Sequence, residues 1–396
     1  MKPEKGFSLI ELMVAITILL VVVAVATNTI IQAQRVSEAV ALQANMQEDL
    51  RAGMHFLVRD LTQAGEGIPA AGISIPNNAG VSNVARPGTP AASIFQSQDA
   101  PPVTYTTLPP VIPGFRLGNV VTTQNPATRA ILTGGFNTDI VTVLYADNTL
   151  VSSVGGANPP LLTAAPVNQP VGPPVCAGAI AANGSSATLD ANCFLMPGSP
   201  TPLQTGDLIM FRNINGTTLQ YVTSRVGQTL NFAAGDPARL NMTGMANGTV
   251  TSINASAVPT TITRVWMVTY YLDTATIPAR PQLIRQVNYP NFPVAAPSNP
   301  PQPVGEVIEN LSFSYDIVNS QAPVGTYPNG PGSAPTPVAP DTPFLFRAVN
   351  VYLGGRSEYP WSGTSPPQFF RNSLSTQVSI RSLSFGVLFP TPGILP

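Results

Sequence analysis

A single acidic residue, Glu11, lies in the apolar N-terminal stretch of the chain. It is the only ionisable side chain between Lys5 and Arg35. An unpaired carboxylate inside a bilayer is costly or loses its charge, so acids in such segments are rare and usually functional. Glu11 is therefore the first residue whose position calls for a chemical role.

The rest of the chain offers few residues for catalysis. It holds one histidine, His55, and its only lysines, Lys2 and Lys5, both precede the apolar stretch. The usual nucleophile and base arrangements are therefore hard to build, and the sequence has no P-loop and no HExxH motif. Carboxylate pairs such as Glu306 with Glu309 do not by themselves define a cleft. We expect no catalytic residue, no enzymatic activity and no cofactor.

The composition argues against nucleic acid and metal ions as ligands. The 396 residues carry 18 basic and 19 acidic side chains, and the formal net charge is −1. Such a chain has no long-range attraction for nucleic acid, and its scattered arginines predict no basic groove with interleaved aromatics. No cluster of cysteines and histidines completes a zinc site, and no clustered oxygen ligands predict a calcium loop. We therefore expect no metal site.

The N-terminal stretch is long enough to cross a membrane. Residues 12–34 are uncharged, and about 20 apolar residues span a bilayer as a helix. Lys2 and Lys5 precede the stretch, so the positive-inside rule places residues 1–6 in the cytoplasm and the C-terminal bulk outside. The helical pattern then continues without the cleavage site of an ordinary signal peptide. These features predict a single-pass membrane protein with an external C-terminal domain.

The two cysteines, Cys176 and Cys193, flank the stretch AGAIAANGSSATLDAN. In an exported chain they predict one disulfide, which would contribute roughly 3 kcal/mol for a loop of this length. Two unpaired buried thiols are the alternative.

The helical pattern continues past Arg35. Apolar residues recur at spacings of four, three and four, which is one face of a helix. They are Leu50, Met54, Leu57 and Leu61. No proline interrupts residues 7–64, so one helix of roughly 87 Å is possible, and Gly65 supplies a stop. We expect this stripe to pack on the protein's own sheet, with coiled-coil pairing as the alternative, and Gly53 to be a weak point of the helix.

The remainder of the chain predicts a β-rich domain. Runs such as DIVTVLYAD, DLIMFRN and VWMVTYYLD are β-branched and aromatic and are bounded by turn residues. The segment NING at 213–216 predicts a hairpin turn. Stretches rich in proline and glycine near 151–205 and 320–343 predict long loops. The predicted fold class is α+β, with one long N-terminal helix packed on a largely antiparallel sheet.

The residues around Glu11 resemble a known family. GFSLIELMVAI is similar to the class III leader of type IV pilins and type II secretion pseudopilins. The resemblance implies that a prepilin peptidase cleaves after Gly6 and N-methylates the new N-terminus, Phe7. It also implies that Glu11 is the acid that serves subunit assembly. Cleavage creates a cationic amine at Phe7, and packed subunits would place it against a neighbour's Glu11, where opposite charges attract strongly.

The resemblance also implies an organisation of the chain. Residues 1–6 would be the leader, 7–34 the transmembrane and filament-core helix, 35–65 its amphipathic continuation, and 66–396 a periplasmic or extracellular globular domain of pilin-like fold. The protein would reside in the inner membrane and then in the pilus at the cell surface. Its implied partners are the prepilin peptidase, the inner-membrane assembly platform, other minor and major pilins, and membrane lipid before assembly.

A second resemblance narrows the family. LRAGMHFLVRDLTQAGEGIP looks like the helix end of PilW-type minor pilins and of J-type pseudopilins, and later strand-like blocks follow in the order of that group. The resemblance covers about half of the chain and implies a low-copy subunit that helps initiate assembly at or near the tip. A J-type pseudopilin of a type II secretion system and a tip adhesin with ligand-binding loops remain alternatives.

Overall fold

A single long helix opens the described part of the chain. α1 (Leu9–Thr62) contains 54 residues, which corresponds to about 81 Å at 1.5 Å per residue. Ser8 caps its N-terminus and Gln63 its C-terminus. Gly65 follows in the left-handed conformation, with φ of 77°, and its N–H donates to the Leu144 carbonyl. The helix therefore ends where the glycine was expected to stop it, because glycine adopts this conformation without strain.

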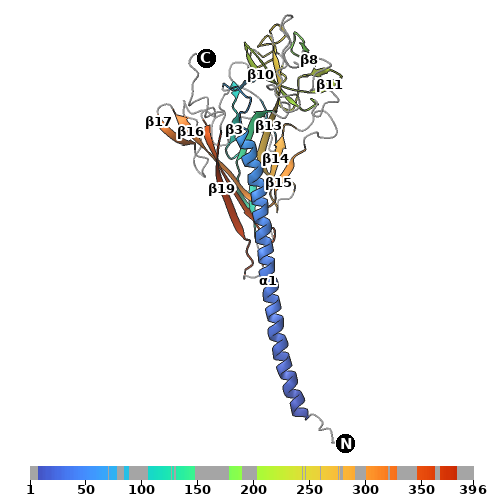
Figure 1. The fold of residues 1–396 in the computed structure, drawn as a ribbon, viewed down its shortest axis with the longest axis vertical. Helices are drawn as coiled ribbons and strands as arrows, with labels where there is room; N and C mark the ends of the chain where they lie inside the picture. The colour runs from blue at the N-terminus through green and yellow to red at the C-terminus, as the bar shows by residue number, and fades with distance from the viewer. Residues whose placement is uncertain are drawn as a thin grey trace, which may run out of the picture.

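The computed structural model places the N-terminal half of α1 outside a sheet-rich domain (Figure 1). The described residues are 8–69, 71–77, 84–88, 106–125, 127–128, 131–147, 178–189, 203–242, 244–245, 247–258, 260–274, 276, 280–289, 300–319, 322–327, 346–361 and 366–380. One long apolar helix followed by a sheet-rich domain is an α+β arrangement consistent with the predicted pilin-like fold.

The largest sheet has nine strands. Their order is β15–β14–β13–β9–β10–β1–β2, with β6 pairing with β13 and β3 pairing with β6. The bounds are β1 (Ile73–Ser74), β2 (Thr107–Leu108), β3 (Val111–Gly114), β6 (Ile140–Ala146), β9 (Leu208–Asn213), β10 (Gly216–Tyr221), β13 (Thr261–Asp273), β14 (Gln282–Val287) and β15 (Gln302–Gly305). The β1–β10 pair is parallel and the other pairs are antiparallel. The prediction of a largely antiparallel sheet is confirmed.

Three smaller sheets accompany it among the described residues, and all are antiparallel. The first has the order β17–β16–β18–β19, with β16 (Ile308–Asn319), β17 (Ala322–Tyr327), β18 (Phe346–Arg356) and β19 (Arg371–Ser379). The second has the order β11–β12–β8–β7, with β7 (Gly178–Ile180), β8 (Ser186–Leu189), β11 (Ser224–Val226) and β12 (Thr229–Asn231). The third pairs β4 (Val120–Gln124) with β5 (Ile131–Asn137). The predicted turn at 213–216 joins β9 to β10, and Asn213 pairs with Gly216 across it.

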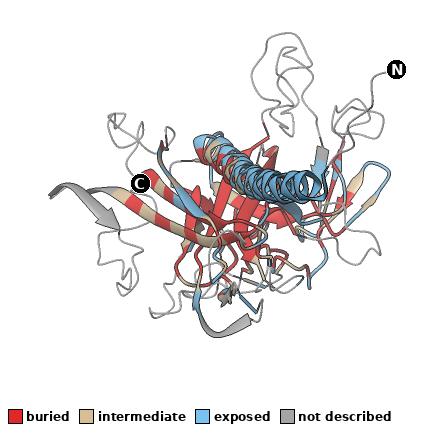
Figure 2. Ribbon diagram, turned by 90° about the horizontal axis from the view of Figure 1, so that it is seen from below, coloured by how far each residue is buried: buried red, intermediate tan, exposed pale blue. Residues whose placement is uncertain are grey.

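The C-terminal half of α1 packs on the domain. Its buried residues are Met46, Leu50, Gly53, Met54, Leu57, Asp60 and Leu61. The apolar ones share a core with Val141 and Tyr270 of the largest sheet and with Phe313 and Leu353 of the β17–β16–β18–β19 sheet. Seen from below, the near part of the helix is exposed, whereas buried residues gather in the strands behind it (Figure 2). The expectation that the apolar stripe packs on the protein's own sheet is confirmed.

Gly53 has a packing role that its helix propensity did not indicate. A Cβ atom at Gly53 would lie 2.9 Å from Cδ2 of Leu283 on β14 and 3.3 Å from Cδ2 of Leu353 on β18. These two strands belong to different sheets, so the glycine lies where α1 covers the junction of both. The missing side chain lets the helix approach this junction closely, which compensates for the low helix propensity of glycine.

We predict that Gly53→Val lowers the free energy of unfolding by about 1–3 kcal/mol, because the added methyl groups overpack a filled junction. Urea unfolding of the full chain in detergent micelles measures the change. Ala52→Val is the matched control, since Ala52 is exposed on the same turn and its substitution changes stability by about 0.5 kcal/mol at most. Equal effects at the two positions would contradict a packing role for Gly53.

Candidate functional site

The carboxylate of Glu11 binds the first turn of its own helix. Its Oε2 accepts a hydrogen bond of 2.9 Å from the Ser8 N–H, and the Glu11 N–H donates to Oγ of Ser8 at 3.3 Å. This reciprocal arrangement is a capping box. It satisfies two of the N–H groups that every helix leaves free at its N-terminus. Glu11 therefore completes the N-terminal capping box of its own helix with Ser8, a role that was not predicted from the sequence.

The helix around and after Glu11 presents apolar side chains on all sides. The large apolar residues from Leu9 to Ile31 that flank it are between 40% and 77% exposed. In the described part of the chain, α1 is the one helix long and apolar enough to cross a membrane, with a mean hydropathy of 2.9 over its most apolar window. This surface fits a membrane anchor, because water would not stabilise so large an apolar area.

Three hydroxyl groups in the apolar half of α1 bond to the helix itself. Thr17, Thr27 and Thr29 donate to backbone carbonyls three or four residues earlier, at distances of 2.8, 2.8 and 2.9 Å. In lipid every polar group must find an internal partner, and this back-bonding supplies one for each hydroxyl. The threonines near position 28 therefore remain compatible with a continuous apolar helix.

Four of the residues singled out from the sequence lie outside the described residues. They are Gly6 and Phe7 at the expected cleavage site, and Cys176 and Cys193 at the expected disulfide. Cleavage, N-methylation and disulfide formation therefore stay predictions.

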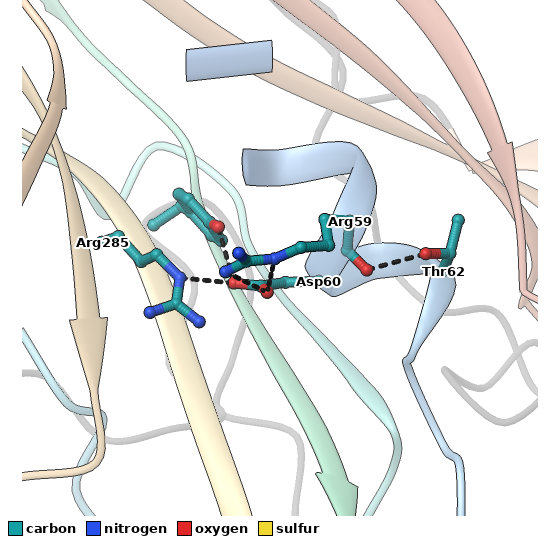
Figure 3. A network of polar contacts seen from close by, with 5 residues as sticks. Arg59, Asp60, Thr62 and Arg285 are labelled. Atoms are coloured by element: carbon teal, nitrogen blue, oxygen red, sulfur yellow. Dashed lines mark hydrogen bonds and ion pairs between the residues drawn. The ribbon is translucent and has the colours of Figure 1, made fainter. Parts of the chain in front are cut away.

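A buried acid near the other end of the helix was not identified from the sequence. Asp60 has a fully buried side chain. Its Oδ2 accepts hydrogen bonds from Nε of Arg285 on β14, at 2.6 Å, and from the hydroxyl of Tyr270 on β13, at 2.7 Å. Its Oδ1 lies 3.3 Å from Nε of Arg59. Figure 3 shows Asp60 between two arginines: Arg59, its neighbour on the helix, and Arg285, which comes from the sheet.

The electrostatics of this network depend on the charge of Asp60. Burial acts to lower the pKa of Arg285, but the hydrogen bond to Asp60 and its negative charge outweigh burial, and the pKa is raised. Burial and then the charge of Asp60 raise the pKa of Tyr270 well above its usual value. Tyr145 is affected in the same way, and its pKa rises to about 12. The arginine therefore stays protonated and both tyrosines stay neutral, with Tyr270 donating its hydroxyl hydrogen to Asp60.

A sequence signal for Asp60 exists. The residue lies three positions after Leu57 and one before Leu61, so it falls on the buried stripe of α1. An acid on a buried helix face needs a partner of opposite charge. Apolar spacing alone does not reveal such an acid, so Asp60 was not predicted as the point of attachment to the sheet.

Glu306 and Glu309, the carboxylate pair considered for chemistry, are held by separate partners, and Asp139 has partners of its own. Glu306 pairs with Arg280 at 2.7 Å, and Glu309 with Arg356 at 2.8 Å. Asp139 accepts 2.9 Å bonds from two backbone N–H groups, one on each oxygen, and burial raises its pKa to about 6 although these bonds oppose the change. No group of three acidic, histidine or cysteine side chains in the described ranges could hold a metal ion. These acids serve the architecture of the domain.

We predict that Asp60→Ala lowers the free energy of unfolding by about 3–5 kcal/mol, because it leaves the charge of Arg285 buried without its counter-ion. Urea unfolding of the full chain in micelles measures the loss. Arg59→Ala is the control from the same network: its side chain is 45% exposed, so the loss should stay below about 1 kcal/mol. A loss for Asp60→Ala no larger than for Arg59→Ala would show that the network does not anchor the helix.

The comparisons with known proteins identify the N-terminal segment. Residues 1–27 match the family described as the prokaryotic N-terminal methylation motif. No curated protein and no solved structure matches the chain. The motif implies processing by a prepilin peptidase and assembly with other pilins, and it indicates a structural subunit rather than an enzyme. Together with the exposed apolar helix that it opens, the motif supports a type IV pilin-like protein of the pilin or pseudopilin type.

Proposed function

We propose that this protein is a PilW-type minor pilin, a low-copy subunit that helps initiate assembly of a type IV pilus at or near its tip. The observation that carries the proposal is the exposed apolar half of α1, most of which lies within the methylation motif. Such a surface is stable in lipid or against the helices of other subunits. The order of strand-like blocks, which resembles that of PilW-type minor pilins, supports the finer assignment.

The proposal assigns a place to each part of the chain. Residues 1–6 are the leader, which the peptidase removes after Gly6, and residues 7–34 span the inner membrane and later enter the filament core. Residues 35–65 continue the helix over the sheet, and residues 66–396 form a domain on the periplasmic side. Cys176 and Cys193 form a disulfide there. The assembly platform of the inner membrane and the other minor and major pilins are the partners.

Glu11 is proposed to connect the membrane state with the assembled state. In the single chain its carboxylate binds the Ser8 N–H. After cleavage, the methylated amine of Phe7 on a neighbouring subunit provides a full positive charge as an alternative partner. A charge-assisted pair in an apolar surround is stronger than a bond to a neutral amide. Glu11 therefore favours the assembled state without being unsatisfied in the membrane.

We predict that the mature chain begins at N-methylated Phe7 and is a rare component of pili. Mass spectrometry of sheared filaments should detect this N-terminal peptide, and quantification against the major pilin should give a low molar fraction. A chain that keeps Met1, or one cleaved near residue 30, would refute the processing. A correctly processed chain that is absent from filaments and found with secretion machinery would instead favour the J-type pseudopilin.

The two roles of Glu11 predict different outcomes for two substitutions. Glu11→Ala removes the charge and the side-chain half of the capping box, whereas Glu11→Gln keeps the capping box, which accepts either Glu or Gln, and removes only the charge. If the ion pair drives assembly, both variants should insert and be cleaved normally but enter filaments about tenfold less, the factor that 1.4 kcal/mol of lost attraction corresponds to. Normal incorporation of Glu11→Gln would refute the ion pair, and if Glu11→Ala were impaired at the same time, the capping bond of residue 11 would be what assembly requires.

A further inference from the structure

Aromatic side chains gather where the domain lies beside the middle of α1. The indole N–H of Trp361 donates to the Arg35 carbonyl of α1 at 3.4 Å. The Trp361 ring lies 5.6 Å from the ring of Phe370, centroid to centroid, and Tyr359 nearby is 45% exposed. We call Tyr359, Trp361 and Phe370 the aromatic tip. β19 begins directly after Phe370 and is antiparallel to β18, so its first residues lie at the end of the sheet nearest the protruding half of α1 (Figure 1).

The aromatic tip lies at the level where the apolar part of the helix ends. Uncharged residues 12–34 of α1 cover about 35 Å at 1.5 Å per residue, close to the hydrocarbon thickness of about 30 Å. Arg35 is the first charged residue after them, so in a spanning helix it falls at the boundary of hydrocarbon and headgroups. Because Trp361 contacts the backbone of Arg35, the aromatic tip falls at this boundary too.

The chemistry of the aromatic tip suits this boundary. Tryptophan and tyrosine combine an apolar ring with a polar edge and concentrate at membrane–water interfaces. The charged side chains around the tip are largely compensated: Arg371 pairs with Glu309 at 3.0 Å, and Glu358 with Arg280 at 3.2 Å. The surface therefore lacks the run of unopposed basic residues that recognises anionic lipid. Its chemistry fits the interfacial zone of a neutral bilayer.

We propose that, before assembly, the aromatic tip rests in the outer interface of the bilayer that α1 spans. The inference rests on the proposed membrane insertion of α1. The domain then has two attachments to the membrane, the helix and the aromatic tip, and these fix its tilt relative to the bilayer. Extraction into a filament must release the tip from lipid while the contacts of α1 with the sheet stay intact.

The two tryptophans of the chain permit a direct test. Trp266 lines the same surface pocket as Arg59, and Arg59 lies 24 residues beyond Arg35 on α1, which is about 36 Å along the helix. Trp266 thus lies far from the boundary of hydrocarbon and headgroups at which Trp361 lies, on the side away from the bilayer. Trp266→Phe leaves Trp361 as the only indole fluorophore, and Trp361→Phe leaves Trp266 as the matched control.

Each variant of the full chain is reconstituted into phosphatidylcholine vesicles that carry a spin-labelled lipid. With the label close to the headgroup, emission of Trp361 should fall roughly twofold, as expected of an indole at the interface. A label at the end of the acyl chain should quench it less, and neither label should quench Trp266. The quenching should persist at high salt, because it does not depend on net charge.

Equal, weak quenching of both tryptophans in vesicles that hold the chain would overturn the proposal. Quenching that disappears at high salt would also overturn it, in favour of electrostatic attraction. A chain that does not float with the vesicles would instead refute the membrane insertion on which the proposed function depends, so the two failures are distinguishable. If Trp266→Phe does not fold, iodide quenching of the unsubstituted chain provides the test, since reconstitution should protect about half of its emission from the aqueous quencher.

Discussion

The burial of Asp60 is the constraint on which the relation of helix and domain depends. Hydrophobic burial of the stripe on α1 stabilises their contact but is non-directional, so it tolerates small rotations and shifts of the helix. A buried carboxylate does not tolerate such movements, because its hydrogen bonds need defined distances. Tyr270 and Arg285 lie on two adjacent strands and bind the same oxygen of Asp60. They therefore fix both the rotation of the helix and its position along the sheet.

This attachment has a consequence at the far end of the helix. α1 runs without a proline from Leu9 to Thr62, so the rotation that is set at Asp60 is carried along the helix to Glu11. The two acids are 49 residues apart in the sequence, which is about 74 Å along a helix. Glu11 needs a defined direction to meet a neighbouring subunit. The contacts that hold the domain on the helix therefore also orient the proposed assembly residue relative to the domain.

The sequence predicted the parts of this structure that depend on local patterns. The apolar stripe, the stop at Gly65 and the strands β6, β9 and β13 all follow from periodicity and turn residues. The order of the strands and the partners of Asp60 were not predictable, because Tyr270 and Arg285 lie 210 and 225 residues away in the sequence. Gly53 shows the same limit. Its low helix propensity is a local property, whereas its packing role depends on the close approach of two sheets that are distant in the sequence.

The capping box explains how an acid is tolerated at the start of an apolar helix. The first N–H groups of any helix have no partner within it, and in an apolar surround each of them would be costly to leave unsatisfied. Ser8 and Glu11 satisfy two of them, and one of these bonds, from the Ser8 N–H, gives the carboxylate a partner. Glu11 is thus stabilised in the single chain by the helix that it caps. A cationic amine on a neighbouring subunit would bind the carboxylate more strongly than the neutral amide of Ser8 does.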